Sequence, residues 1–207
     1  MRKTVLGKFA LGVSVVVAAN QAELCRFQAL VGLKVGEASA VLARLGSPTE
    51  TDSYKGMSLQ RWSLPNGNEL SVTVGTEGKI VYLESDWGGQ SDDAGCDLPD
   101  LHFGLTTLAE LRKRFGSNGF GFKSRGPGVK TPDGFVMMNS FEVGTSVITF
   151  HTKIKGDKFQ RLKASGADPS PADYAKLDAI SIADDAYASR EWGDRVYDPA
   201  YKKIEWK

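Results

Sequence analysis

The stretch GEASAVLARLGSP, residues 36–48, decides the expected fold, because a second copy of its pattern, TTLAELRKRFGS, returns at residues 106–117. In both copies apolar residues recur at helical spacing and end at a glycine, Gly46 in the first and Gly116 in the second. Helices this short are marginal alone, so each must pack its apolar side on the strands that follow it. The repeat predicts an α+β fold of two tandem units, each with a short N-terminal helix or helical pair on an antiparallel sheet of three to four strands.

The second helix is the better marked of the two. Thr107, followed three residues later by Glu110, forms a capping-box pattern, which satisfies amide donors left free at a helix start. The apolar positions are Ala38, Val41, Leu42 and Leu45 in the first helix and Leu108, Leu111 and Phe115 in the second.

Alternating and apolar runs place the strands that follow each helix. The expected strands are residues 57–64, 69–74 and 79–85 in the first unit and 135–143, 147–154 and 177–183 in the second. In the strand at 79–85 we expect Val81 and Leu83 to face inward. The dipeptide Asn66-Gly67 predicts a tight hairpin turn.

Composition divides the chain into five segments. They are a signal peptide at 1–22, a first helix-plus-sheet repeat at 23–89, an acidic linker at 90–100, a second repeat at 101–186 and an aromatic C-terminal tail at 187–207. The glycine-rich stretch 116–134 is expected to be a mobile loop. The tail holds five of the ten Tyr and Trp residues, so we expect it to pack across a sheet edge or the seam between units, with binding to another protein as the alternative.

Residues 1–22 have the pattern of a secretory signal peptide. A basic start precedes an apolar run at residues 9–19, which is too short to span a bilayer. Cleavage is expected after Ala19 or Ala22, leaving a periplasmic or secreted protein without a permanent membrane anchor. A buried N-terminal helix is the alternative, and the flanking charges make it the less favoured one.

The charge balance excludes one class of partner. Cleavage removes three of the 26 basic residues and none of the 25 acidic ones, so the mature chain carries 23 against 25. A nucleic-acid-binding protein normally shows a basic stripe or a strongly basic domain, and we therefore expect no nucleic-acid partner. Residues 84–100 are acidic and residues 153–163 are basic, and solvated loops are the simplest interpretation of both.

Cys25 and Cys96 are the only cysteines, and they occupy similar places at the start of each unit. Export brings them into an oxidising compartment, so one intramolecular disulfide is the simplest expectation. Two free thiols or an intermolecular bridge stay open, because equivalent positions in a tandem pair need not lie within bonding distance. The acidic Glu23 close before Cys25 does not suit a lipid-attachment site.

The sequence shows no catalytic, cofactor or metal motif. The stretch at residues 116–124 departs from a phosphate-binding loop in its spacing, and it follows a helix where such a loop follows a strand. The two histidines, His102 and His151, lack Cys, Asp or Glu clusters at metal-ligand spacing. His151 would act as a general base only if the fold supplied a nucleophile and an orienting carboxylate. We expect no cofactor, no metal and no catalytic residue.

A family resemblance rests mainly on the first unit. The residues that carry it are Gly36, Val41, Leu42, Leu45, Gly46 and Pro48, with Trp62 and Gly78-Lys79-Ile80-Val81. This pattern resembles the SmpA/OmlA (BamE-like) outer-membrane proteins, and its repetition resembles the β-lactamase inhibitory proteins. The resemblance covers the larger part of the mature chain, strongly in the first unit and weakly in the second. It implies a small α+β fold and a binding role, and it transfers no catalytic residue.

The expected function is that of an exported, non-enzymatic, monomeric protein that binds another envelope protein, as an assembly factor or an inhibitor-like module. A structural or small-ligand-binding envelope module is the alternative, and a hydrolase without a recognisable motif is the third. Helices cover one face of a sheet, so alternation sends small polar side chains to the other face. The binding residues expected on or beside that open face are Ser71, Thr73, Tyr82, Trp87, Thr149, His151 and Ser181.

Overall fold

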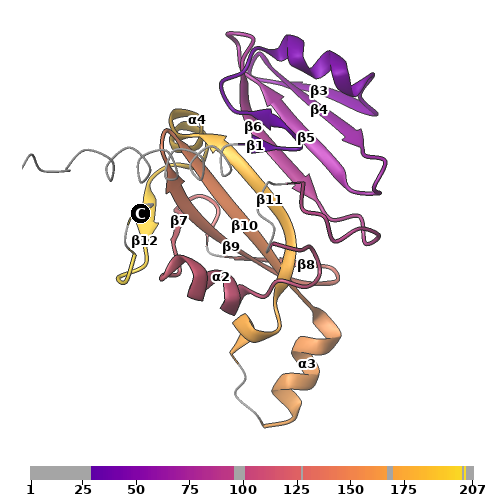
Figure 1. The fold of residues 1–207 in the computed structure, drawn as a ribbon. Coiled ribbons are helices and arrows are strands. Elements are labelled where there is room, and N and C mark those ends of the chain that lie inside the picture. Colours follow the sequence, from indigo (N-terminus) through magenta and orange to yellow (C-terminus); the bar gives the residue numbers. More distant parts are fainter. Residues whose placement is uncertain (1–28, 96–100, 127, 167–169, 202, 204–207) are drawn as a thin grey trace, which may run out of the picture.

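A ten-stranded antiparallel sheet dominates the computed structural model, which describes residues 29–95, 101–126, 128–166, 170–201 and 203 (Figure 1). Neighbouring strands follow the order β12-β7-β9-β10-β11-β6-β5-β4-β3, and β8 pairs with β9 beside this path. The strands are β3 (Glu50–Tyr54), β4 (Met57–Ser63), β5 (Glu69–Val74), β6 (Ile80–Asp86), β7 (Phe120–Phe122), β8 (Gly128–Thr131), β9 (Gly134–Val143), β10 (Ser146–Lys155), β11 (Lys176–Asp184) and β12 (Arg195–Tyr197). A separate hairpin consists of β1 (Ala29–Leu30) and β2 (Leu33–Lys34). With its few short helices, the chain has an α+β fold.

The helices of the described ranges are η1 (Ser39–Leu45), α2 (Leu108–Phe115), α3 (Gly156–Ala164), η2 (Pro171–Asp173) and α4 (Asp185–Trp192). Both helices of the sequence repeat are present, the first as a 3-10 helix and the second as an α-helix. The α2 capping box is confirmed, because the Glu110 amide donates to the Thr107 hydroxyl at 3.2 Å and the Thr107 amide donates to the Glu110 carboxylate at 2.7 Å. Gly116 ends α2 with a φ of 68°, in the left-handed region that favours glycine.

The two expected sheets are one sheet, because β6 and β11 pair edge to edge. Each strand would otherwise be the outer strand of a meander, with a row of unpaired backbone groups. Their antiparallel pairing joins a first half (residues 29–95) to a second half (residues 101–201), and it includes the buried pair of Leu83 and Ile182. The expectation of two separate sheets of three to four strands is therefore wrong.

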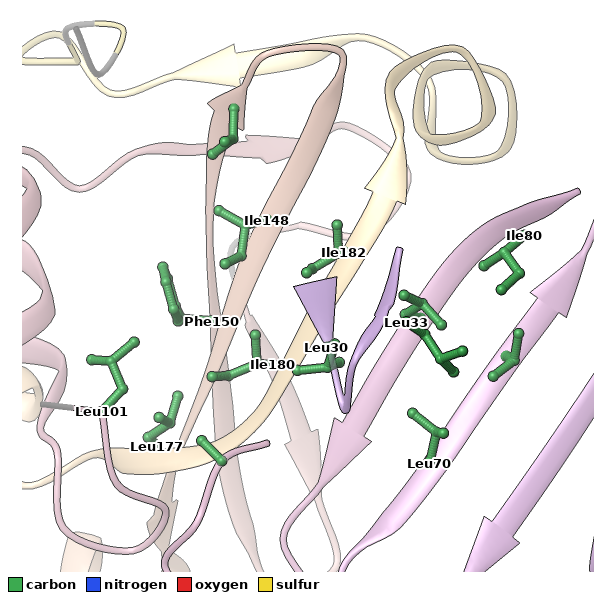
Figure 2. Close-up of a cluster of buried hydrophobic side chains, with 14 of the residues drawn as sticks. Leu30, Leu33, Leu70, Ile80, Leu101, Ile148, Phe150, Leu177, Ile180 and Ile182 are labelled. Carbon is green, nitrogen blue, oxygen red and sulfur yellow. The ribbon is translucent and has the colours of Figure 1, made fainter. Parts of the chain in front are cut away.

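One hydrophobic core runs along a single side of the sheet, called the core face below. The β1–β2 hairpin, η1 and α2 cover this face and bury Leu30, Leu42 and Leu111 in the core. Figure 2 shows the apolar side chains following the sheet from Leu70 in the first half to Phe150 in the second. The core crosses the β6–β11 pairing without a break, so the two halves share it.

The opposite side, called the polar face below, carries a helix that the sequence did not reveal. This helix, α4, buries Ala188 and Trp192 against Val147 of β10 and Ala183 of β11. Asp184 caps it, because its carboxylate accepts a hydrogen bond from the Tyr187 amide at 2.9 Å. The expected boundary between the second repeat and the tail, at residues 186 and 187, falls inside α4.

Strand β6 differs from expectation in which side chains it buries. The β5–β6 register runs from the pair Thr73 and Tyr82 to the pair Val74 and Ile80, which leaves Val81 as the extra residue of a bulge. Ile80 is fully buried in place of Val81, while Leu83 faces inward as expected. A bulge adds one residue to one strand, and strict alternation cannot anticipate it.

Two segments expected to be loops contain regular structure. The glycine-rich stretch 116–134 forms β7 and β8, so the expectation of a mobile loop is wrong there. The basic segment 153–163 forms the end of β10 and most of α3, which projects from one end of the sheet in Figure 1.

Part of the aromatic tail packs on a sheet edge, as expected. Strand β12 pairs with β7, and the rings of Tyr197 and Tyr201 lie 5.2 and 5.7 Å from the ring of Phe120. Arg195 of β12 forms ion pairs with Glu142 and Asp185, which join the edge strand to β9 and α4.

The predicted signal peptide and the predicted Cys25–Cys96 disulfide lie outside the described residues, and both stay predictions. Within the described ranges, none of the helices has the length and apolar character that crossing a membrane requires.

Candidate functional site

Strand register brings six of the seven expected binding residues onto the polar face. Glu84 of β6 lies between Ser71 of β5 and Ser181 of β11. Ser181 pairs in turn with Thr149 of β10, so one row of polar side chains crosses four neighbouring strands. The six residues are Ser71, Thr73, Tyr82, Thr149, His151 and Ser181.

The seventh expected residue, Trp87, packs against the core instead. A Cβ built on Gly104 would lie 2.4 Å from Cη2 of Trp87, so the ring occupies the space beside this glycine. Trp87 thus supports the core, and a partner on the polar face does not reach it.

The second-half end of the polar row is buried. Ser181 is 1% exposed and Thr149 is 5% exposed. The Thr149 hydroxyl shares a 2.8 Å hydrogen bond with the Ser140 hydroxyl, and the Ser181 hydroxyl shares one of 3.1 Å with Nε2 of His151. Buried hydroxyl groups are tolerated when they are hydrogen-bonded. These residues form an internal polar layer rather than a contact surface.

A groove of about 320 Å³ opens over the first-half end of the row. The exposed edge strand β3 contributes Glu50 and Asp52 to its rim. Its other lining comes from β4, β5, β6 and the turn after β7. This lining includes Arg61, Ser71, Thr73, Tyr82, Glu84 and Arg125.

Arg125 lines the groove from a turn that is hydrogen-bonded to α4. The backbone amide and the hydroxyl of Ser124 both donate to the carbonyl oxygen of Trp192, at 3.4 and 2.6 Å. The guanidinium carbon of Arg125 lies 4.2 Å from the centre of the Trp192 ring, in a cation–π contact. Partial burial lowers the pKa of Arg125, but a guanidinium stays charged at neutral pH. Nothing in the described part of the chain forms an ion pair with Arg125.

Arg61 of β4 also lines the groove. Its guanidinium contacts the carboxylates of Glu50 and Glu69 at 3.4 and 3.9 Å and donates to the Ser71 hydroxyl at 3.3 Å. The side chain is half-exposed, so these ion pairs are the weak, solvent-screened kind.

Glu84 lines the groove with both arginines, and each guanidinium acts on it electrostatically. Burial raises the pKa of Glu84 from 4.5 to about 8, the neighbouring Asp86 carboxyl acts in the same direction, and Arg125 and Arg61 oppose both effects. Burial also raises the pKa of Asp86. Glu84 is therefore mostly protonated at neutral pH. A strongly shifted pKa inside a groove identifies this position as a candidate functional site.

An aromatic cluster holds the groove side chains in place. The Tyr82 ring lies 5.8 Å from the Trp192 ring and 6.2 Å from the Tyr187 ring, both on α4. Burial raises the pKa of Tyr187, and its hydrogen bond to Thr73 acts against this shift. Helix α4 thus also explains why Thr73, expected on a solvated face, is buried.

The hydrogen bond between His151 and Ser181 has the arrangement of a general base beside a nucleophile. Burial lowers the pKa of His151 to about 4, and Arg125 acts in the same direction, so the imidazole is neutral at pH 7. Among the described residues no carboxylate orients the ring, and Ser181 is almost fully buried. The geometry suits a hydrogen bond within the internal polar layer better than attack on a substrate.

Within the described ranges, no group of three or more His, Cys, Asp or Glu side chains could hold a metal ion. His102 lies away from the polar row, with its Nδ1 3.2 Å from the Asp92 carboxylate.

Sequence reasoning missed Arg61, Glu84 and Arg125 of the groove. Alternation from Tyr82 also sends Glu84 to the polar face, so the signal for this carboxyl was present in β6. Arg125 had no such signal, because no periodicity fixes the path of the glycine-rich stretch around it. Its position depends on α4, which the sequence did not reveal.

Comparisons with known proteins give two similar solved structures. One is a DUF4309 family protein (YjgB) from Bacillus subtilis, with 12% identity over 82% of this chain and 95% of that chain and a TM-score of 0.45. The other is an extracellular protein containing an SCP domain from Bacillus anthracis, with 11% identity, 96% of this chain and 56% of that chain covered, and a TM-score of 0.40. No family model and no curated protein matches the sequence. At such low identities and TM-scores, neither structure assigns a function.

Proposed function

We propose that this chain is an exported, non-enzymatic protein that binds another protein through the groove on the polar face. The observation that carries the proposal is the presence of Tyr82 and Arg125 at one groove, each packed against the aromatic cluster of α4. Tyr and Arg side chains are among those that most often dominate interface energies. Because these two are already held in place, little side-chain entropy is lost when a partner binds. Ser71 beside them offers a small polar group to the partner.

The proposed location is the periplasm or another space outside the cytoplasm. It rests on the leader pattern of residues 1–22. The role of an envelope assembly factor or inhibitor-like module rests on the resemblance to the SmpA/OmlA and β-lactamase inhibitory proteins, and we propose that the chain acts as a monomer.

We also propose that the two halves are copies of one unit. The first half runs through η1 and then β3, β4, β5 and β6, and the second runs through α2 and then β7, β9, β10 and β11, with both sets of strands in spatial order. A two-fold rotation at the β6–β11 pairing would exchange the halves. Leu83 and Ile182 occupy equivalent positions in the two sequence repeats, and they pair with each other at this seam.

Site-specific photo-crosslinking in the native cell envelope tests the binding proposal. Benzoylphenylalanine in place of Leu59, which lines the groove, should give a cross-linked protein product. The same residue in place of Val129, which is 47% exposed on β8, is the matched control and should not. Equal products at the two sites would contradict the proposal, and a small-ligand-binding module would give no protein product at either site.

A second measurement concerns the anchor itself. Tyr82→Ala should weaken capture of the cross-linked partner about thirtyfold, because a true anchor contributes about 2 kcal/mol. Tyr82→Phe keeps the ring packed on Trp192 and should retain most of the binding. Full binding by a folded Tyr82→Ala variant would place the interface elsewhere.

A hydrolase is the second candidate function, and the hydrogen bond of 3.1 Å between His151 and Ser181 favours it. A fluorophosphonate probe reacts with activated serine hydroxyl groups and provides a direct test. Labelling of the folded protein that disappears in Ser181→Ala would favour the hydrolase. Absence of labelling, together with a groove-dependent cross-link, would favour the binding protein.

A further inference from the structure

The charges in the groove indicate which chemical group of a partner fits there. We infer that Arg125 and Arg61, which line the groove together with Glu84, bind a carboxylate of the partner protein. The group recognised is an Asp or Glu side chain or a C-terminal carboxylate. This inference rests on the proposed function and adds the chemistry of its contact.

Arg125 has the geometry of a preorganised carboxylate receptor. Its backbone is fixed because the adjacent Ser124 donates twice to Trp192, and its guanidinium carbon lies over the Trp192 ring. Among the described residues it has no ion-pair partner, so the N–H edge of the guanidinium is available for hydrogen bonds. That edge carries a fork of donors that matches a carboxylate in two parallel hydrogen bonds.

Arg61 supplies the second positive charge. Its ion pairs with Glu50 and Glu69 are long and half-exposed, so they contribute little and a partner carboxylate can replace them at small cost. Its hydrogen bond to Ser71 directs part of the guanidinium across the polar face.

Glu84 decides whether a carboxylate is accepted. In its protonated form it shares a hydrogen bond with Asp86 and carries no charge that would repel a bound carboxylate. Its ionised form would repel a carboxylate and neutralise the arginines. Its surroundings favour the protonated form at neutral pH, because burial and Asp86 both raise its pKa. Two more groups lie one step further away: Glu69 pairs with Asp86, and the neutral His151 is hydrogen-bonded to Ser181. The groups that act on Glu84 or pair with it directly are Asp86 on its own strand, Ser71 on β5, Ser181 on β11, Arg61 on β4 and Arg125 on the turn after β7.

The same surroundings favour a single negative charge over a phosphate group. Glu50 and Asp52 line the rim of the groove, and Asp86 lies beside Glu84. A dianion would meet this additional negative potential, whereas a carboxylate brings only one charge to two guanidinium groups. A protein segment with an acidic residue therefore fits the groove better than a phosphorylated ligand does.

The test measures carboxylate binding to the full exported chain by NMR of the arginine side-chain Nε–H groups. The probes are N-acetylglutamic acid amide, which has only a side-chain carboxylate, and N-acetylglycine, which has only a terminal one; N-acetylglutamine amide is the uncharged control. We expect saturable shifts of the Arg125 signal with one or both acids and none with the control. The acid that binds more tightly identifies the source of the carboxylate. No saturable shift with either acid would overturn the inference.

Two variants separate the groove from general charge effects. Arg125→Gln should weaken binding of the acid about tenfold or more, because a hydrogen bond to a charged group is lost. Arg190→Gln is the matched control. The guanidinium carbon of Arg190 lies 5.6 Å from the centre of the Tyr187 ring on α4, but Arg190 does not line the groove. Equal losses in the two variants, or inorganic sulfate binding as tightly as the acids, would overturn the inference.

The pH dependence gives an independent readout. Binding of the acid should weaken between pH 7 and pH 9 as Glu84 ionises, and Glu84→Gln should remove most of this dependence while it still binds at pH 9. An unchanged pH profile in Glu84→Gln would contradict the role of this carboxyl. If carboxylates do not bind but the Leu59 cross-link persists in Arg125→Gln, the carboxylate inference fails and the proposed function stands. If the parent protein also gives no Leu59 cross-link, both fail.

Discussion

Shortening one side chain at the seam should destabilise both halves of the protein together. Leu83 of β6 is fully buried and pairs with Val72 of β5 on one side and Ile182 of β11 on the other. Leu83→Ala therefore leaves a cavity in contact with both halves. Substitutions of this kind cost about 2–5 kcal/mol, depending on how far the surroundings collapse. We expect about 3 kcal/mol, because ordered strands on both sides limit collapse, and hence a melting temperature lower by about 9 °C for a domain of this size.

Two measurements check this expectation. Thermal unfolding followed by circular dichroism gives the change in melting temperature, with Leu105→Ala as a control that should change stability by less than about 0.5 kcal/mol because Leu105 is 57% exposed. Hydrogen exchange with mass spectrometry reads the peptides of β4–β5 and β9–β10 separately. If the halves form one cooperative unit, both sets of peptides should lose the same protection free energy in Leu83→Ala.

Two outcomes would refute the reasoning. Loss of protection confined to β4–β5 would mean that the halves unfold independently and that the shared core does not couple them. A loss of stability as small as that of Leu105→Ala would mean that Leu83 is not buried at the seam.

Three further predictions use other parts of the molecule. The raised pKa of Glu84 means that the folded state holds one more proton than the unfolded state between pH 4.5 and about 8. The stability that this proton contributes is lost as pH rises through about 8. Urea titrations should therefore show a smaller loss of stability from pH 6.5 to 9 in Glu84→Gln than in the parent. Thr107→Ala should lower the free energy of unfolding in urea by about 1 kcal/mol at pH 7. The loss should be smaller at pH 3, because the Thr107 hydrogen bonds lower the pKa of Glu110 and their contribution to stability disappears as pH falls through that pKa. Gly119→Ala and Gly78→Ala place alanine at the same φ of 73°, but only the Cβ at 119 would meet a backbone oxygen of β9, at 2.3 Å. The thermal stability of Gly119→Ala should therefore fall by about 1–3 kcal/mol more, and equal losses would contradict the close approach.

Local patterns predicted both helices of the sequence repeat and six of the strands. The spacing of Leu108 and Leu111, with Thr107 and Glu110 before and within the helix, determined α2 through interactions inside one turn. Alternation located β5 with its observed ends, because its two faces differ in polarity over six residues. Such signals depend on neighbours along the chain, and the sequence displays them directly.

The features that the sequence did not reveal depend on distant contacts. The stability of helix α4 comes from Trp192 and Ala188 packing on the polar face, against Val147 of β10 and Ala183 of β11. The glycines of residues 116–134 suggested a loop, but close backbone approach at the sheet edge is what Gly119 provides there. The pairing of β6 with β11 joins strands almost a hundred positions apart. No local pattern contains that information.

The candidate groove depends on this same pairing, because its charged residues come from both halves. Arg61 and Glu84 belong to the first half, whereas Arg125 and the aromatic residues of α4 belong to the second. The first half alone would lack Arg125, the second guanidinium that acts on Glu84. A duplicated unit could therefore acquire a binding site at its seam that a single copy lacks, since the seam brings charges from two chain segments onto one face. Stability at Leu83 and carboxylate binding at Arg125 should for this reason decline together in variants that open the β6–β11 pairing.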